Sequence, residues 1–98
     1  MRVISIKKLR TFWEKYRAAE KPLRAWYHEA KIARWKNFTE IKRHYPSADV
    51  LPNNRVIFDI KGNTYRIVVQ IRYAPLFLVF IRFIGTHADY DRIDATTV

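Results

Sequence analysis

The sequence predicts an α+β fold in which two N-terminal helices pack on one face of a small antiparallel sheet. Three observations support this prediction. Apolar residues recur at helical spacing in the first half, they alternate from residue 55 onward, and the hydrophobic fraction of 49% suffices for a core. A chain of 98 residues has room for one compact domain, so we predict a single domain over residues 1–98.

The first half is predicted to start with a short edge strand, Val3 and Ile4, and to continue as two helices. Ser5 can cap the first helix, since a serine hydroxyl accepts a bond from an unpaired first-turn amide. Pro22 suits the first turn of the second helix. Because the turn near residues 18–21 is short, the two helices should be antiparallel. Their apolar stripes are Ile6, Leu9, Phe12, Trp13 and Tyr16, then Leu23, Trp26, Tyr27, Ala30 and Ala33.

A shorter helix and a loop are expected to lead into the sheet. Asn37 followed by Glu40 is a capping-box pattern, which predicts a helix start. Pro46 should end this helix after one or two turns. The polar, proline-containing residues 46–54 are predicted to form a loop.

Three strands then follow as an antiparallel meander over residues 55–60, 64–73 and 76–84. Residues 61–63 tolerate positive φ and predict the turn of the first hairpin. Ala74-Pro75 separates the second predicted strand from the third. One face of the two longer strands is apolar and should meet the helices. It consists of Tyr65, Ile67, Val69, Ile71, Tyr73, Phe77, Val79, Ile81 and Phe83. The opposite face is mixed and carries Arg66, Arg72 and Arg82.

Charge and cysteine content narrow the class of protein. The net charge of +10 favours a polyanionic partner such as nucleic acid, an acidic protein or anionic lipid. Residues 1–45 hold 13 basic and four acidic side chains, against six and five in the remainder. The absence of cysteine excludes disulfides, and no signal peptide or membrane-length apolar run is present. We therefore expect a cytoplasmic protein without membrane contact.

Two arginines on the mixed face point to an anion. If the hairpin pairs residues whose numbers sum to 148, Arg66 and Arg82 lie opposite each other, with Cβ atoms roughly 5 Å apart. Two uncompensated guanidiniums at that distance repel, and a shared phosphate would relieve the repulsion. Taken singly, exposed strand arginines are more often solvated or salt-bridged.

A histidine, a tyrosine and an aspartate follow the last strand. His87 comes just after Gly85 and can exchange a proton near neutral pH. Tyr90 can stack on a base or aid proton transfer, and Asp91 can orient the histidine. Two arginines, a histidine and a tyrosine suffice for RNA cleavage by its own 2′-hydroxyl, which needs proton transfer and phosphorane stabilisation but no metal.

Each of these residues also has a structural interpretation. His87 can be an ordinary turn residue, Tyr90 can seal the sheet edge, and Asp91 can cap a turn. His28 and His44 are interpreted as structural or surface residues, and three scattered histidines make zinc binding a poor hypothesis. The tryptophans Trp13, Trp26 and Trp35 are expected in the core or at a partner surface. A non-catalytic basic module that binds RNA, DNA or an acidic partner therefore stays open.

The segments "FDIKGNTYRIVVQIRY" and "VFIRFIGTHADYDRID" resemble the HigB toxins, a branch of the RelE-like mRNA interferases of bacterial toxin–antitoxin modules. The opening "LRTFWEKYRAAEKPLRAWYHEAKIARW" and the middle "SADVLPNNRVIFDI" are also similar to that branch. The most specific parts are Gly62 to Arg66 and Arg82 to Asp91.

The resemblance implies a RelE-like fold and cleavage of mRNA on the translating ribosome. It implies a HigA-like helix-turn-helix antitoxin as inhibitor, with operator DNA bound only through that antitoxin. By the same resemblance, the catalytic positions are Arg66, Arg82, His87 and Tyr90, with Lys61 and Asp91 as substrate-binding residues. The basic helical surface would hold ribosomal RNA. No cofactor or metal is expected, and a degenerate toxin kept as an interaction subunit is a further alternative.

Overall fold

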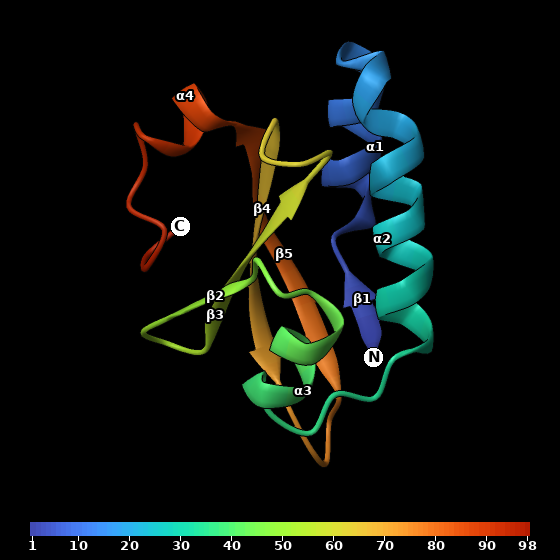
Figure 1. The fold of residues 1–98 in the computed structure, drawn as a ribbon, viewed down its shortest axis with the longest axis vertical. Coiled ribbons are helices and arrows are strands. Elements are labelled where there is room, and N and C mark those ends of the chain that lie inside the picture. Colours follow the sequence, from blue (N-terminus) through green and yellow to red (C-terminus); the bar gives the residue numbers. More distant parts are fainter.

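The computed structural model describes all residues, 1–98, and shows an α+β fold with a five-stranded sheet. The N-terminal half contains β1 (Arg2–Ile4), α1 (Ile6–Lys15), a 3-10 turn (Arg17–Ala19), α2 (Glu20–Ile32) and α3 (Phe38–His44). The second half contains β2 (Asp49–Leu51), β3 (Arg55–Ile60), β4 (Tyr65–Arg72), β5 (Leu78–Thr86) and α4 (His87–Tyr90). The strand order is β1-β5-β4-β3-β2 (Figure 1).

The sheet is mixed, so the prediction of a purely antiparallel sheet is wrong. β1 runs parallel to β5, with Arg2 opposite Leu78 and Ile4 opposite Phe80. The pairing partner lies at the far end of the chain, and local residue patterns carry no information on that direction. The predicted loop at residues 46–54 also contains β2, which pairs with β3 through a tight turn. Asn53 and Asn54 form this turn at positive φ, a conformation that asparagine tolerates.

The helix starts agree only partly with the expected caps. Ser5 does not cap α1 with its side chain, because it adopts a left-handed conformation (φ 74°) that turns the chain out of β1. Its carbonyl instead accepts a bond from Lys8 N. Asn37 does cap α3, since its Oδ1 accepts a bond from Glu40 N at 3.1 Å. The Glu40 carboxylate accepts from Lys36 N rather than from Asn37 N.

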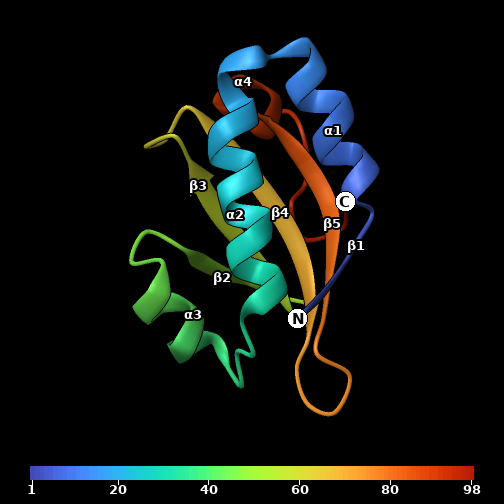
Figure 2. The same ribbon diagram turned by 90° about the vertical axis from the view of Figure 1, so that its right-hand side faces the viewer.

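One side of the sheet carries the main core, which joins residues of α1, α2 and α3 to alternate residues of β3, β4 and β5. Figures 1 and 2 show α1 and α2 on this side of the sheet. Leu9, Leu23, Phe58, Ile67 and Val69 are fully buried there. The predicted apolar stripes of the helices and of β4 therefore lie in the core.

The opposite side of the sheet, the predicted mixed face, is also packed. Residues 91–98, here called the C-terminal tail, fold back over it (Figure 1). Ala95 is buried with Ile57 and Val68, and Ile93 and Val98 pack against them. The Arg55 Nη2 donates to the Val98 oxygen at 2.6 Å, and Arg55 is 8% exposed. The mixed face is therefore largely a second, smaller core.

A β-bulge in β5 sets which side chains reach each core. Val68 pairs with Phe83 but Val69 pairs with Ile81, which leaves Arg82 as the extra residue. Beyond the bulge the alternation reverses, so Ile84 packs against the helix-side core and Phe83 against the tail. The prediction that Phe83 faces the helices is wrong for this reason.

Gly85 lies inside β5 rather than in a turn, and it permits α4 to pack close to the strand. A Cβ added there would lie 2.6 Å from Phe83 Cζ and 2.9 Å from Asp89 Cβ. Gly62, by contrast, has open space around its Cα but a positive φ of 66°.

We expect Gly85→Ala to lower the free energy of unfolding by about 2 kcal/mol or more, because the new methyl overlaps two side chains. Gly62→Ala should cost only about 1 kcal/mol, from backbone conformation alone. Urea denaturation of both variants measures the difference. Equal losses would show that α4 can move away from β5 at little cost.

The tail has its own pH-sensitive contact. Hydrogen bonds from the Thr96 hydroxyl and Thr96 N hold the pKa of Asp94 below its ordinary value, with Arg55 nearby adding to the effect. A carboxylate with a lowered pKa in the folded state stabilises the fold above its unfolded pKa and loses this contribution as pH falls.

We expect Asp94→Asn to lower the melting temperature at about pH 7, where the carboxylate accepts both bonds. The gap to the parent should narrow as the pH falls through the lowered pKa of Asp94 and the carboxylate becomes protonated. Asp49→Asn is the control, since Asp49 is exposed and makes no side-chain hydrogen bond or ion pair of its own. A gap that persists at low pH would contradict the role given to the charge.

Candidate active site

The predicted pairing of Arg66 with Arg82 is wrong. Arg66 pairs with Gly85, and Arg82 lies three residues earlier on β5 at the bulge. A strand advances about 3.3 Å per residue, so the two backbone positions are offset by about 10 Å. The extra bulge residue shifts the register, and residue alternation alone does not reveal it.

Arg66 has partners of its own on β3 and α4. Its Nε lies 3.2 Å from Asp59 Oδ1, the residue directly opposite on β3. Its guanidinium carbon lies 4.6 Å from the centre of the Tyr90 ring. The side chains of Arg66 and Asp59 are 25% and 18% exposed. The structure thus brings the predicted Arg66 and Tyr90 together, and Asp59 fixes the guanidinium and offsets its charge.

Arg82 is an exposed arginine of β5 and has no acidic partner. Its Nη2 donates to the neutral Gln70 Oε1 at 2.7 Å, and its guanidinium carbon lies 5.5 Å from the Phe80 ring centre. None of the four ion pairs of the structure includes it. The full positive charge of Arg82 is therefore available to an external anion.

His87 is the first residue of α4, and a capping box fixes its backbone. Thr86 Oγ1 accepts from Asp89 N, and Asp89 Oδ2 accepts from Thr86 N, each at 3.1 Å. The half-buried imidazole makes no hydrogen bond, and its Nε2 is shielded from solvent. This leaves Nδ1 as the ring nitrogen open to a ligand.

The two remaining predicted residues, Lys61 and Asp91, lie at the periphery of the candidate site. Lys61 is exposed in the β3–β4 turn at φ 55°, and Asp91 is exposed at the end of α4. Neither side chain makes an ion pair. Both can meet a long substrate without forming part of the central cluster.

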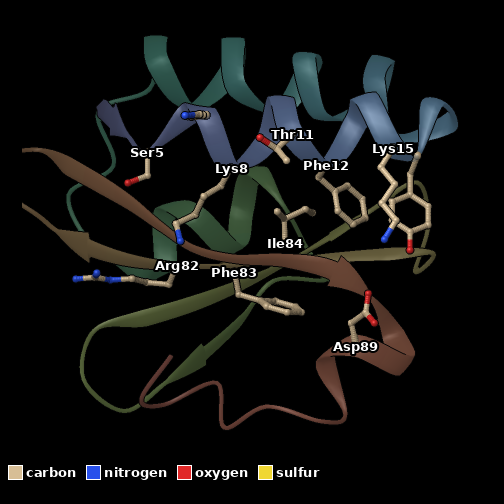
Figure 3. Close-up of a pocket in the computed structure, with 11 residues that line it drawn as sticks. Ser5, Lys8, Thr11, Phe12, Lys15, Arg82, Phe83, Ile84 and Asp89 are labelled. Carbon is tan, nitrogen blue, oxygen red and sulfur yellow. The ribbon is translucent and has the colours of Figure 1, made fainter.

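A basic pocket opens between α1 and the outer edge of β5 (Figure 3). It has a volume of 720 Å³ and is lined by Ser5, Lys7, Lys8, Thr11, Phe12, Lys15, Tyr16, Arg82, Phe83, Ile84 and Asp89. In Figure 3, Lys8 and Lys15 extend from α1 toward β5, while Arg82 projects outward at one end. The one acidic residue, Asp89, is engaged in the α4 capping box. Arg82 thus belongs to a larger positive surface.

Sequence reasoning missed three contributors to this region: Asp59, Gln70 and the lysines of α1. The predicted turn at residues 61–63 would place Tyr65 opposite Asp59. The turn in the structure spans residues 61–64 and makes Arg66 the partner, so the predicted turn length hid this pair. Gln70 lies opposite Phe80, and its amide meets Arg82 at the bulge two residues further along β5. The lysines meet the β5 edge only through tertiary packing, which periodicity does not reveal.

Some groups with shifted pKa values lie elsewhere. Burial and the Glu29 carboxylate, which accepts a hydrogen bond from the phenol, raise the pKa of Tyr45. Burial also raises the pKa of Tyr73. No cluster of three or more His, Asp or Glu side chains is suited to hold a metal ion. None of the helices has the length and hydrophobicity needed to cross a bilayer.

Comparison with known proteins gives one informative match. The sequence model of the HigB_toxin family, described as the RelE-like toxic component of a toxin-antitoxin system, matches residues 19–93. This range includes β2 to β5, α4 and all six predicted site residues. A comparison with curated proteins finds no match.

The Asp59–Arg66 pair should be energetically coupled more strongly than a surface pair. We expect a double-mutant cycle with Asp59→Ala and Arg66→Ala to give about 1 kcal/mol of coupling in the free energy of unfolding. The control cycle on Glu20 and Arg24, an exposed pair on α2, should give about 0.3–0.5 kcal/mol. Equal coupling in both cycles would mean that Asp59 does not hold Arg66 in place.

Proposed function

Because the chain belongs to the HigB family of RelE-like toxins of toxin–antitoxin systems, we propose that it is an mRNA interferase. It cleaves mRNA on the translating ribosome and thereby inhibits translation. Its inhibitor is a HigA-like helix-turn-helix antitoxin, and operator DNA is reached only through that antitoxin. The site of action is the bacterial cytoplasm, where the ribosomes are.

The observation that carries this proposal is the state of Arg82. It projects from a bulge at the end of a positive pocket, bonded to a neutral amide and free of carboxylates. An unneutralised guanidinium is suited to bind a phosphodiester and to stabilise the added negative charge of a phosphorane. His87 follows at the end of the same strand, so anion binding and proton transfer are available from one segment.

The reaction needs no external nucleophile. The ribose 2′-oxygen loses its proton and attacks the adjacent phosphorus, and the bond from phosphorus to the 5′-oxygen breaks. The 5′-oxygen takes up a proton, so the products are a 2′,3′-cyclic phosphate and a 5′-hydroxyl. His87 transfers one of these protons through its open Nδ1, and Arg82 neutralises the phosphorane.

The remaining residues position the RNA. Arg66, held in place by Asp59, contacts the RNA backbone on the other side of the bulge from Arg82. Tyr90 is fixed by its stacking on Arg66 and orients the splayed nucleotide or aids proton transfer. Lys61 and Asp91 contact the flanking chain. The exposed lysines and arginines of α1 and α2 hold ribosomal RNA, with an affinity that falls steeply with salt.

A non-catalytic basic module is the second candidate. Two observations favour it: Asp59 already neutralises Arg66, and Nε2 of His87 is shielded. Such a module would bind RNA, DNA or an acidic partner without cleaving RNA, as would a degenerate toxin kept as an interaction subunit.

The test is translation-coupled cleavage of mRNA by the purified protein and three variants. We expect His87→Ala to lower the cleavage rate about 100-fold or more, because a proton-transfer group is lost. Arg82→Ala should cost a similar factor, about 100-fold, through lost transition-state stabilisation. The control Arg72→Ala removes an exposed arginine of β4 outside the cluster and should change the rate by less than about twofold.

Primer extension locates the cut, and end-group analysis identifies the cyclic phosphate. Cleavage at the parental rate by both His87→Ala and Arg82→Ala would refute the assigned roles. RNA binding by the parent protein without any cleavage, with or without ribosomes, would favour the non-catalytic module.

A further inference from the structure

The outer edge of β5 is only partly covered. β1 pairs with Leu78 to Phe80 and then leaves the sheet at Ser5, whereas β5 continues to Thr86. Residues 81–86 therefore have β4 on one side and no strand on the other. An edge of this kind presents unpaired backbone groups and is a template for an added strand.

The pocket between α1 and β5 runs along this open edge. Figure 3 shows Thr11 and Phe12 of α1 above the strand and Ile84 pointing up from it. The pocket lining combines apolar side chains, among them Phe12 of α1 and Ile84 of β5, with the cations Lys7, Lys8, Lys15 and Arg82 (Figure 3). A strand seated here would place alternate side chains against the apolar lining and the others among the cations.

The aromatic residues of the pocket are poorly placed to stack on bases. The Phe12 ring is stacked on Tyr16 at 4.6 Å and has the Tyr65 ring against it at 5.4 Å. The Phe83 ring packs toward Tyr90 on the tail side. Single-stranded RNA grooves usually offer free aromatic faces, whereas an open strand edge favours a polypeptide.

From this arrangement we propose that the pocket binds an extended acidic segment of the antitoxin, which adds to the sheet as a strand beside residues 81–86 of β5. Membership of a toxin–antitoxin family implies such a partner, and the pocket charge specifies its chemistry. Alternating apolar and acidic residues fit the apolar lining and the lysines of the pocket. The same cations repel a second copy of this basic chain, so the open edge selects against self-pairing.

Strand addition at this edge would also occupy Arg82. An acidic side chain near the bulge would neutralise the guanidinium that the proposed reaction uses for phosphate. Binding at the edge nevertheless does not depend on RNA cleavage, so the two proposals can fail separately.

The experiment uses the full chain and a fluorescein-labelled decapeptide of alternating glutamate and valine, followed by fluorescence anisotropy. We expect Lys8→Glu to weaken binding about tenfold or more. Arg10→Glu makes the same charge change on the same helix, outside the pocket, and should weaken binding by less than about twofold at about 0.15 M salt. The same peptide with alternate amides N-methylated keeps its charge and should not bind.

Hydrogen exchange distinguishes strand pairing from charge attraction alone. Bound peptide should slow exchange of amides within residues 81–86 of β5, because added-strand bonds protect them. Equal binding by the N-methylated peptide, or unchanged exchange at this edge, would overturn the proposal. A uridine decamer provides a further test. The proposal would also be overturned if this RNA displaced the peptide and bound Lys8→Glu as weakly as the peptide does, since the pocket would then be an RNA-binding site.

The partner itself provides the final comparison. In the complex with its antitoxin, the β5 edge should be protected in the same residues, and Lys8→Glu should weaken the complex more than Arg10→Glu. Protection confined to other surfaces would overturn the proposal even if the toxin cleaves mRNA as proposed.

Discussion

The extra residue at the β-bulge of β5 is the constraint on which the site and both cores depend. With Val68 opposite Phe83 and Val69 opposite Ile81, Arg82 has no place in the regular alternation. Its side chain therefore leaves the ladder, while the residues beyond it exchange faces. Ile84 then completes the helix-side core, and Phe83 completes the core under the tail. Without the extra residue, strict alternation from Ile81 would direct Phe83 toward the helices and Ile84 toward the tail.

The second core explains why some arginines of the sheet have hydrogen-bonding or acidic partners whereas Arg82 has no acidic partner. A small domain gains stability by covering both faces of its sheet, and here the tail covers the face that the helices leave open. Charges beneath that cover need partners, since desolvation penalises an unpaired ion. Arg55 donates to the Val98 oxygen and Arg66 is held by Asp59. Arg82, displaced to the edge, stays hydrated and needs no carboxylate.

Local patterns were enough to predict much of the fold. Helical spacing located α1 and α2, and the Asn37 cap located α3. Alternation and the positive-φ turn at Lys61 and Gly62 located the hairpin of β3 and β4. Chemistry also singled out Arg82 and His87, because guanidinium and imidazole groups near a strand end are suited to phosphate. What failed was long-range: the direction of β1, the pairing of β2 and the register of β5. These features depend on contacts between segments that are far apart in the sequence. The bulge, for example, places Ile84 in one core and Phe83 in the other.

The exposed outer edge of β5 is subject to two opposing constraints. It must not pair with another copy of the chain, and it must stay open if Arg82 is to meet a polyanion. Covering the edge with a longer β1 would satisfy the first requirement and defeat the second. Surrounding it with Lys7, Lys8, Lys15 and Arg82 satisfies both, because like charge repels another basic chain at the distance where strands pair. Any partner able to overcome that repulsion has to be acidic, and it would then neutralise the same cation that an RNA phosphate needs. Under the two proposals, substrate and inhibitor compete through a shared charge, even where the rest of their contacts lie on different surfaces.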